Sequence, residues 1–292
     1  MKRLLIPFFI LCLLLSSCAD TQPPAQIAAT TLPVWEFTSR LCDGTGITVT
    51  RLVTESVSCL HDYTLQVGQM RAIEGAEVIV ISGAGLEEFL HDALHGADSV
   101  IDASSSIELF CPEEDHDHNH DDHGHHHEND PHIWLSPANA AVMARNICDG
   151  LIDRYPQYTD IFSRNLDVLL VDLRTLDAYG KEQLANLSCR DIITFHDGFA
   201  YFAEYYGLHI LRAVEEESGS EASAAELIEL IEEVEHHQLP AIFIEANGAD
   251  AAARTISTET GAEVYTLDMA MAGDSYFDAM YHNINTLKEA LE

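Results

Sequence analysis

Short apolar segments with strand patterning alternate with helical segments twice along this chain, once on each side of a long helical stretch. In the first half, strands are expected at 27–30, 47–53, 78–82 and 99–102, with helices between them at 34–41, 65–74 and 86–94. In the second half, strands are expected at 191–195, 208–214, 241–245 and 263–267, and helices at 199–206, 222–237, 249–260 and 276–291. Strands that alternate with helices form parallel sheets with helices on their faces. The sequence therefore predicts an α/β fold of two similar lobes, each a roughly four-stranded parallel sheet flanked by helices.

The stretch between the two halves is predicted to be mostly helical. A first helix is expected at 138–154 and a second at 158–187. The second has no glycine before Gly180 and would be about 45 Å long at 1.5 Å per residue. A helix of that length suits a rigid spine between two lobes better than an element inside one. The predicted domain limits are 26–136 for the N-terminal lobe, 137–188 for the helical connection and 189–292 for the C-terminal lobe.

The N-terminal segment has the pattern of an export signal. Lys2 and Arg3 precede an apolar run over 4–15, which is shorter than the ~20 residues that a membrane-spanning helix needs. The run ends in Leu-Ser-Ser-Cys, which resembles the bacterial lipobox. We therefore expect a signal peptide at 1–17, lipidation at Cys18 and a tether over 18–25, with ordinary signal cleavage as the alternative. This arrangement predicts a lipid-anchored protein on the extracytoplasmic face of a cell membrane.

The charge balance indicates which partners the chain can attract. It has 14 basic and 49 acidic residues, for a formal net charge of −35. Nucleic-acid binding needs a basic surface, so a nucleic-acid partner is not expected. An acidic surface favours cations, although most of these carboxylates are expected simply to face solvent.

A histidine-rich loop is expected at 113–130, inside the first lobe. It holds seven histidines among many carboxylates: His116, His118, His120, His123, His125, His126 and His127. Histidine-rich tracts commonly bind metal, but a segment this charged cannot lock its side chains in place. We expect it to form weak auxiliary metal sites that pass metal on or sense its abundance. A solvated acidic loop without a metal role is the alternative.

Four other residues with metal-binding side chains follow predicted strands: His61, His132, His196 and Asp268. Open α/β sheets bind ligands beyond the carboxyl ends of their strands, so these residues are expected at edges that face a shared cleft between the lobes. Three imidazoles and one carboxylate form a donor set that suits tetrahedral Zn²⁺. Each residue taken singly could equally be a surface histidine or carboxylate.

At these residues the sequence resembles the metal-specific solute-binding proteins of bacterial ABC importers, in the branch that captures zinc or manganese. The segments "LHDYTLQ", "DPHIWLSPANAAVMARNI" and "FHDGFAYFAEYYGLHI" resemble the motifs of the first three ligands. Two C-terminal segments, "SGSEASAAELIELIEEVEHHQLPAIFIE" and "TLDMAMAGDSYFDAMYHNINTLKEAL", resemble the second lobe. The resemblance covers the chain from Ile27 to its C-terminus. It implies the ligands His61, His132 and His196, with Asp268 as the fourth ligand or a near neighbour.

The resemblance also implies a role. It predicts a monomeric receptor, not an enzyme, that binds Zn²⁺ and delivers it to a membrane permease driven by a cytoplasmic ATPase. The manganese members tend to have a carboxylate where this chain has His196, and a histidine-rich loop is typical of the zinc members. The alternatives are a receptor for manganese or another divalent metal, a zinc-dependent hydrolase and a surface adhesin. Against the hydrolase, the sequence contains no HExxH motif. The chain departs from the family before His61, where Cys59 could compete as a ligand.

Overall fold

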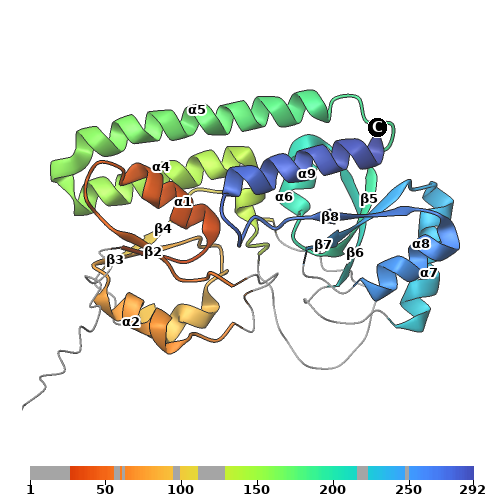
Figure 1. The fold of residues 1–292 in the computed structure, drawn as a ribbon, viewed down its shortest axis with the longest axis horizontal. Coiled ribbons are helices and arrows are strands. Elements are labelled where there is room, and N and C mark those ends of the chain that lie inside the picture. The colour runs from red at the N-terminus through yellow and green to blue at the C-terminus, as the bar shows by residue number, and fades with distance from the viewer. Residues whose placement is uncertain are drawn as a thin grey trace, which may run out of the picture.

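The computed structural model describes residues 27–55, 60, 63–94, 99–110, 129–215, 223–246 and 250–292. Two four-stranded parallel sheets stand side by side (Figure 1). The first has the strand order β2 (Val49–Arg51), β1 (Ile27–Ala29), β3 (Val78–Ile81) and β4 (Val100–Asp102). The second has the order β6 (His209–Glu215), β5 (Asp191–His196), β7 (Ala241–Glu245) and β8 (Glu263–Leu267). The predicted α/β fold of two similar lobes is confirmed, while the predicted domain limits stay predictions.

Helices cover both sheets and join them. Those of the first lobe are α1 (Leu32–Leu41), α2 (Val67–Gly75) and α3 (His91–Leu94). The connection consists of α4 (Pro137–Arg154) and α5 (Thr159–Gln183), and the second lobe has α6 (Ala200–Tyr206), α7 (Ala224–His237), α8 (Ala251–Thr260) and α9 (Tyr276–Leu291). In Figure 1, α5 runs above both lobes and α9 lies below its second half. Within the described ranges, no helix is both long and apolar enough to cross a membrane.

The spine helix is confirmed but is shorter than predicted. Helix α5 has 25 residues, or roughly 37 Å at 1.5 Å per residue. The chain turns away from the helix after Gln183, and the Arg190 side chain holds this turn. The Arg190 guanidinium donates to the carbonyl oxygens of Leu184 and Ala185, at 2.9 and 3.1 Å.

The expected helix at 86–94 forms only in its last part. A 3-10 turn, η1 (Glu88–Leu90), leads into the single-turn helix α3. The Glu87 side chain folds back onto the end of β3, where its carboxylate accepts hydrogen bonds from the backbone N–H groups of Ser82 and Gly83 at 2.7 and 3.0 Å. This contact holds the chain before Glu88 in a turn, so the helix begins late.

Burial shifts the pKa of the Glu87 carboxyl group. It is 6% exposed and also accepts a hydrogen bond from the Thr30 hydroxyl at 2.6 Å. Loss of hydration raises the pKa of Glu87 from 4.5 to about 7; the hydrogen bonds from Thr30, Ser82 and Gly83 oppose this shift, and the Asp102 carboxylate adds to it.

This shift predicts a pH-dependent loss of stability. The unfolded chain releases the Glu87 proton near pH 4.5, while the folded protein holds it to about pH 7. Raising the pH through this window therefore costs stability on the order of 3 kcal/mol, at about 1.4 kcal/mol per pKa unit. In urea denaturation, the unfolding free energy of wild type minus that of Glu87→Gln should fall by this amount between pH 4.5 and 7.5. A difference that does not change with pH would contradict the assignment.

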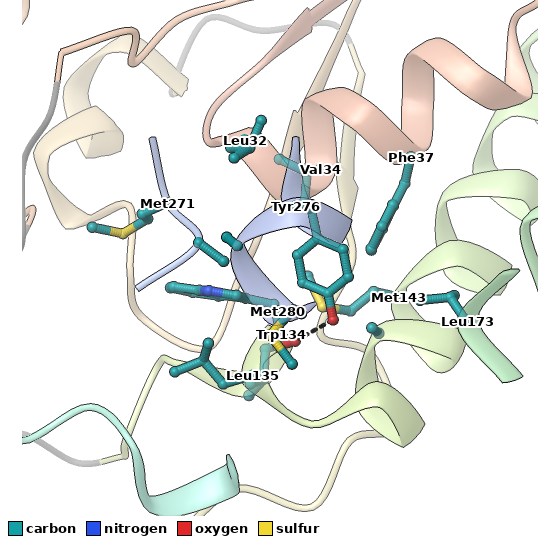
Figure 2. Packing of buried hydrophobic residues seen from close by; sticks show 14 of the residues in the cluster. Leu32, Val34, Phe37, Trp134, Leu135, Met143, Leu173, Met271, Tyr276 and Met280 are labelled. Atoms are coloured by element: carbon teal, nitrogen blue, oxygen red, sulfur yellow. Dashed lines mark hydrogen bonds between the residues drawn. The ribbon is translucent and has the colours of Figure 1, made fainter. Parts of the chain in front are cut away.

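A single large hydrophobic core contains residues from both lobes. Its largest side chains include Trp134, Tyr276, Phe37, Phe162 and Phe202, each 0–1% exposed. Figure 2 shows α1, α4, α5, α9 and the segment after β8 all contributing side chains around Trp134 and Tyr276. The two lobes are therefore packed against one another as well as connected by α5.

The segment from 268 to 275 forms a second connection between the lobes. It follows β8 of the second lobe, yet its backbone bonds to the first. The Met271 carbonyl accepts from the Leu32 N–H at 3.2 Å, and the Gly273 carbonyl accepts from the Arg51 guanidinium at 2.7 Å. At its end, the Tyr276 N–H donates to Glu36 at 2.6 Å. These bonds fix residues that follow Asp268 against the N-terminal lobe.

Candidate metal site

His196 is the last residue of β5, so its ring lies at the carboxyl edge of the second sheet. The neighbouring strand β7 ends at Glu245, and the pairing of Thr194 with Phe243 brings the two strand ends level with one another. His196 Nδ1 lies 3.3 Å from Glu245 Oε1, and both side chains are buried, at 5% and 6% exposure. The imidazole is thus in contact with a carboxylate on the side of its Nδ1 atom.

His132 is held by the residue two positions before it. One oxygen of Asp130 accepts from the His132 backbone N–H at 2.9 Å and lies 2.8 Å from its Nδ1. The ring is 5% exposed and packs edge-on against Trp134 in η2 (Ile133–Leu135). This imidazole therefore also has a carboxylate at Nδ1.

The two histidine rings meet through their Nε2 atoms, which are 3.4 Å apart, with the ring planes at 89°. Tetrahedral zinc with Zn–N bonds of about 2.0–2.1 Å keeps its ligand nitrogens roughly 3.3–3.4 Å apart. The separation is therefore the one that a shared zinc ion requires. A proton on the Nδ1 atom of each ring would leave the two Nε2 lone pairs facing one another, an arrangement that a cation between them stabilises.

Gly198 provides room beside these rings. A Cβ atom there would lie 2.7 Å from Cδ2 of His196, 3.1 Å from its Nε2 and 2.5 Å from the methyl group of Met269. Any side chain at this position would displace the His196 ring. Sequence reasoning missed Gly198, although its place two residues after a strand-end histidine is a usable signal.

Asp268 comes directly after β8 and is fixed by its own loop. Its Oδ1 accepts from the Ala270 N–H at 2.7 Å, and the Asn283 side chain bonds both its backbone N–H and its carbonyl at 2.7 Å. The next residue, Met269, accepts a hydrogen bond at 2.7 Å from the indole N–H of Trp134, which lies two residues after His132. The chain segments of His132 and Asp268 are thus joined directly.

The structure brings together His132 and His196 from the predicted ligand set. It shows no group of three or more His, Cys, Asp or Glu side chains placed to hold a metal, among the residues it describes. His61 and the seven histidines of the 113–130 segment lie outside those residues, as do Cys18 and Cys59. The set of four ligands therefore stays a prediction.

Comparisons with known proteins identify the family. The family model described as "Zinc-uptake complex component A periplasmic" matches residues 27–290. A zinc-binding lipoprotein of Streptococcus pneumoniae is 30% identical over 311 residues, which cover 100% of this chain and 62% of that protein. A putative metal-binding protein of Treponema pallidum is 30% identical, with 86% and 83% covered, and a manganese-binding lipoprotein of Halalkalibacterium halodurans is 27% identical, with 79% and 77% covered. The chain belongs to the zinc-uptake complex component A family.

Solved structures agree with this assignment. A crystal structure of ZnuA superposes with a TM-score of 0.78 at 28% identity, covering 91% of this chain and 99% of that one. The Zn(II)-bound ZnuA-like domain of Streptococcus pneumoniae AdcA superposes with a TM-score of 0.77 at 27% identity, covering 92% and 99%. The chain thus spans the whole of that domain but about 62% of the full-length Streptococcus pneumoniae relative.

Proposed function

We propose that this protein is an extracytoplasmic zinc receptor. It binds Zn²⁺ between its lobes through His61, His132, His196 and Asp268 and delivers the ion to the membrane permease of an ABC importer with a cytoplasmic ATPase. It acts as a monomer, held to the membrane by a lipid on Cys18. The observation that carries the proposal is the 3.4 Å separation of the His132 and His196 Nε2 atoms, which fits shared tetrahedral zinc. The names of the zinc-binding relatives support it.

Capture and release require no bond-making chemistry, so the receptor is not an enzyme. Four protein ligands complete the tetrahedral coordination sphere of a zinc ion. They leave no open position for the water that a zinc hydrolase activates. Coordination of zinc by Asp268 as the fourth ligand therefore distinguishes a receptor site from a hydrolase site. The histidines of the 113–130 segment serve as weak auxiliary sites that raise the local supply of zinc.

The manganese-binding relative makes manganese the second candidate cargo. Manganese is a harder ion that favours carboxylate and carbonyl oxygens, whereas imidazole nitrogens suit zinc. Since both side chains that meet at the site are imidazoles, zinc is favoured.

Metal titration of metal-free protein that begins at Ala19 tests this proposal. Zinc and manganese are each added in competition with a coloured chelator, and the dissociation constants are compared. We expect one tight zinc site and manganese binding weaker by at least about 100-fold, because Mn²⁺ binds most weakly of the divalent first-row transition metals at nitrogen donors. Equal or tighter manganese binding would contradict a zinc receptor.

A further inference from the structure

We propose that Asp130 and Glu245 are positioning residues of the metal site. Each carboxylate fixes the imidazole of one histidine, so that both Nε2 atoms face the same metal position. This inference rests on the proposed function, because it assigns roles to residues around that zinc site.

Asp130 is well placed to orient His132 because it is itself fixed from both lobes. Its backbone N–H donates to the Phe110 carbonyl at 2.8 Å, and its own carbonyl accepts from the Tyr201 hydroxyl at 3.0 Å. Tyr201 belongs to α6 of the second lobe, and its ring stacks on Phe110 with centroids 4.4 Å apart. A carboxylate anchored in this way holds both the backbone and the ring of His132 through one oxygen.

Glu245 orients His196 through the sheet. In parallel pairing, Thr194 of β5 is level with Phe243 of β7, so the residues two positions further on, His196 and Glu245, point to the same face. Their side chains are almost completely buried, and the ring contacts the carboxylate at 3.3 Å. The strand register, which no loop movement changes, therefore sets the position of this carboxylate behind the ring.

The two contacts have the same consequence at both rings. A carboxylate that accepts the Nδ1 proton selects the tautomer whose Nε2 atom is free to bind metal, and it makes that nitrogen a stronger donor. The contact also restricts rotation of the ring about its Cβ–Cγ bond, because turning the ring would carry Nδ1 away from the carboxylate oxygen. Two rings held at 89° with their Nε2 atoms 3.4 Å apart form half of a tetrahedral site before metal arrives.

The variants Asp130→Ala and Glu245→Ala test the inference, with Asp130→Asn and Glu245→Gln as conservative replacements that keep an oxygen acceptor. Glu263→Ala is the matched control, since Glu263 is an exposed glutamate at the opposite end of the same sheet. Zinc dissociation constants are measured by chelator competition on the soluble protein. We expect both alanine variants to bind zinc about 10- to 100-fold more weakly than wild type. The Asn and Gln variants should recover part of that loss, and Glu263→Ala should match wild type.

A second readout separates positioning from general damage to the fold. Cobalt(II) bound in place of zinc absorbs visible light according to its ligand geometry, so the alanine variants should change the band shape while Glu263→Ala does not. Thermal unfolding of the metal-free proteins identifies any variant that fails to fold. If an alanine variant does not fold, zinc affinity and cobalt spectra of the Asn and Gln variants are compared with wild type instead. Wild-type affinity and spectra in all four variants would overturn the positioning roles. The absence of a tight zinc site in wild type would instead overturn the proposed function.

Discussion

Replacing Trp134 with alanine should lower the free energy of unfolding of the metal-free protein by about 3–5 kcal/mol, the usual cost of deleting a large buried aromatic side chain. Trp134 is fully buried in the core that the two lobes share. Its indole N–H donates to the Met269 carbonyl at 2.7 Å, and its own carbonyl accepts from the Tyr276 hydroxyl at 2.8 Å, as Figure 2 shows for the second bond. The variant thus loses packing and a buried hydrogen bond together. Urea denaturation followed by circular dichroism measures the change.

One further variant isolates the contribution of the hydrogen bond to this loss of unfolding free energy, and a second serves as a surface control. Trp134→Phe keeps an aromatic ring but leaves the Met269 carbonyl without its donor, which should cost about 1–3 kcal/mol for the unmade bond. Val168→Ala, on the exposed face of α5, should change stability by less than about 0.5 kcal/mol. If Trp134→Ala were no more destabilising than Val168→Ala, the shared core would not hold the lobes together.

Replacing His196 with alanine should weaken zinc binding by about 100- to 1000-fold. Structural zinc sites bind with roughly 10–16 kcal/mol, so each of four ligands contributes about 2.5–4 kcal/mol, at 1.4 kcal/mol per tenfold change. His196 is the proposed ligand to remove, because it is buried at a strand end and its Nε2 atom meets that of His132. Calorimetric titration of the metal-free protein with zinc measures the change.

His209→Ala is the matched control for this variant. His209 begins β6, next to the N-terminal end of β5, and its exposed ring contacts Asp191 at 3.0 Å. Its removal should leave the tight zinc site unchanged. Equal losses in the two variants would mean that zinc binds to exposed histidines generally and not between His132 and His196.

Hydrophobic periodicity was sufficient to predict the fold, because each strand and helix has its own local pattern. It could not predict that a side chain bonds back to the backbone, which is why the late start of α3 after Glu87 and the end of α5 near Arg190 were missed. Both depend on hydrogen bonds that the apolar pattern does not record.

The site was predictable only in part, for a related reason. His132 and His196 stand out because each follows a strand or a long loop, and the structure brings them together. Glu245 faces His196 through the register of two strands that are 45 residues or more apart in the chain, and Trp134 meets Met269 across 135 residues. Sequence spacing alone does not fix such long-range pairings. The contact between Asp130 and His132 could have been predicted, because a carboxylate two residues before a candidate ligand is a local feature of the sequence.

The most direct test of a zinc site between the lobes is a calorimetric zinc titration of four proteins: wild type, His196→Ala, a deletion of residues 115–128, and the two changes combined. The deletion removes the seven histidines of the 113–130 segment and leaves Asp130 and His132 in the chain. We predict that the deletion keeps one tight site and loses only weak binding, while His196→Ala loses the tight site with or without the segment. A tight site that disappears with the deletion and survives His196→Ala would contradict the account, because the histidine-rich segment would then be the receptor's binding site.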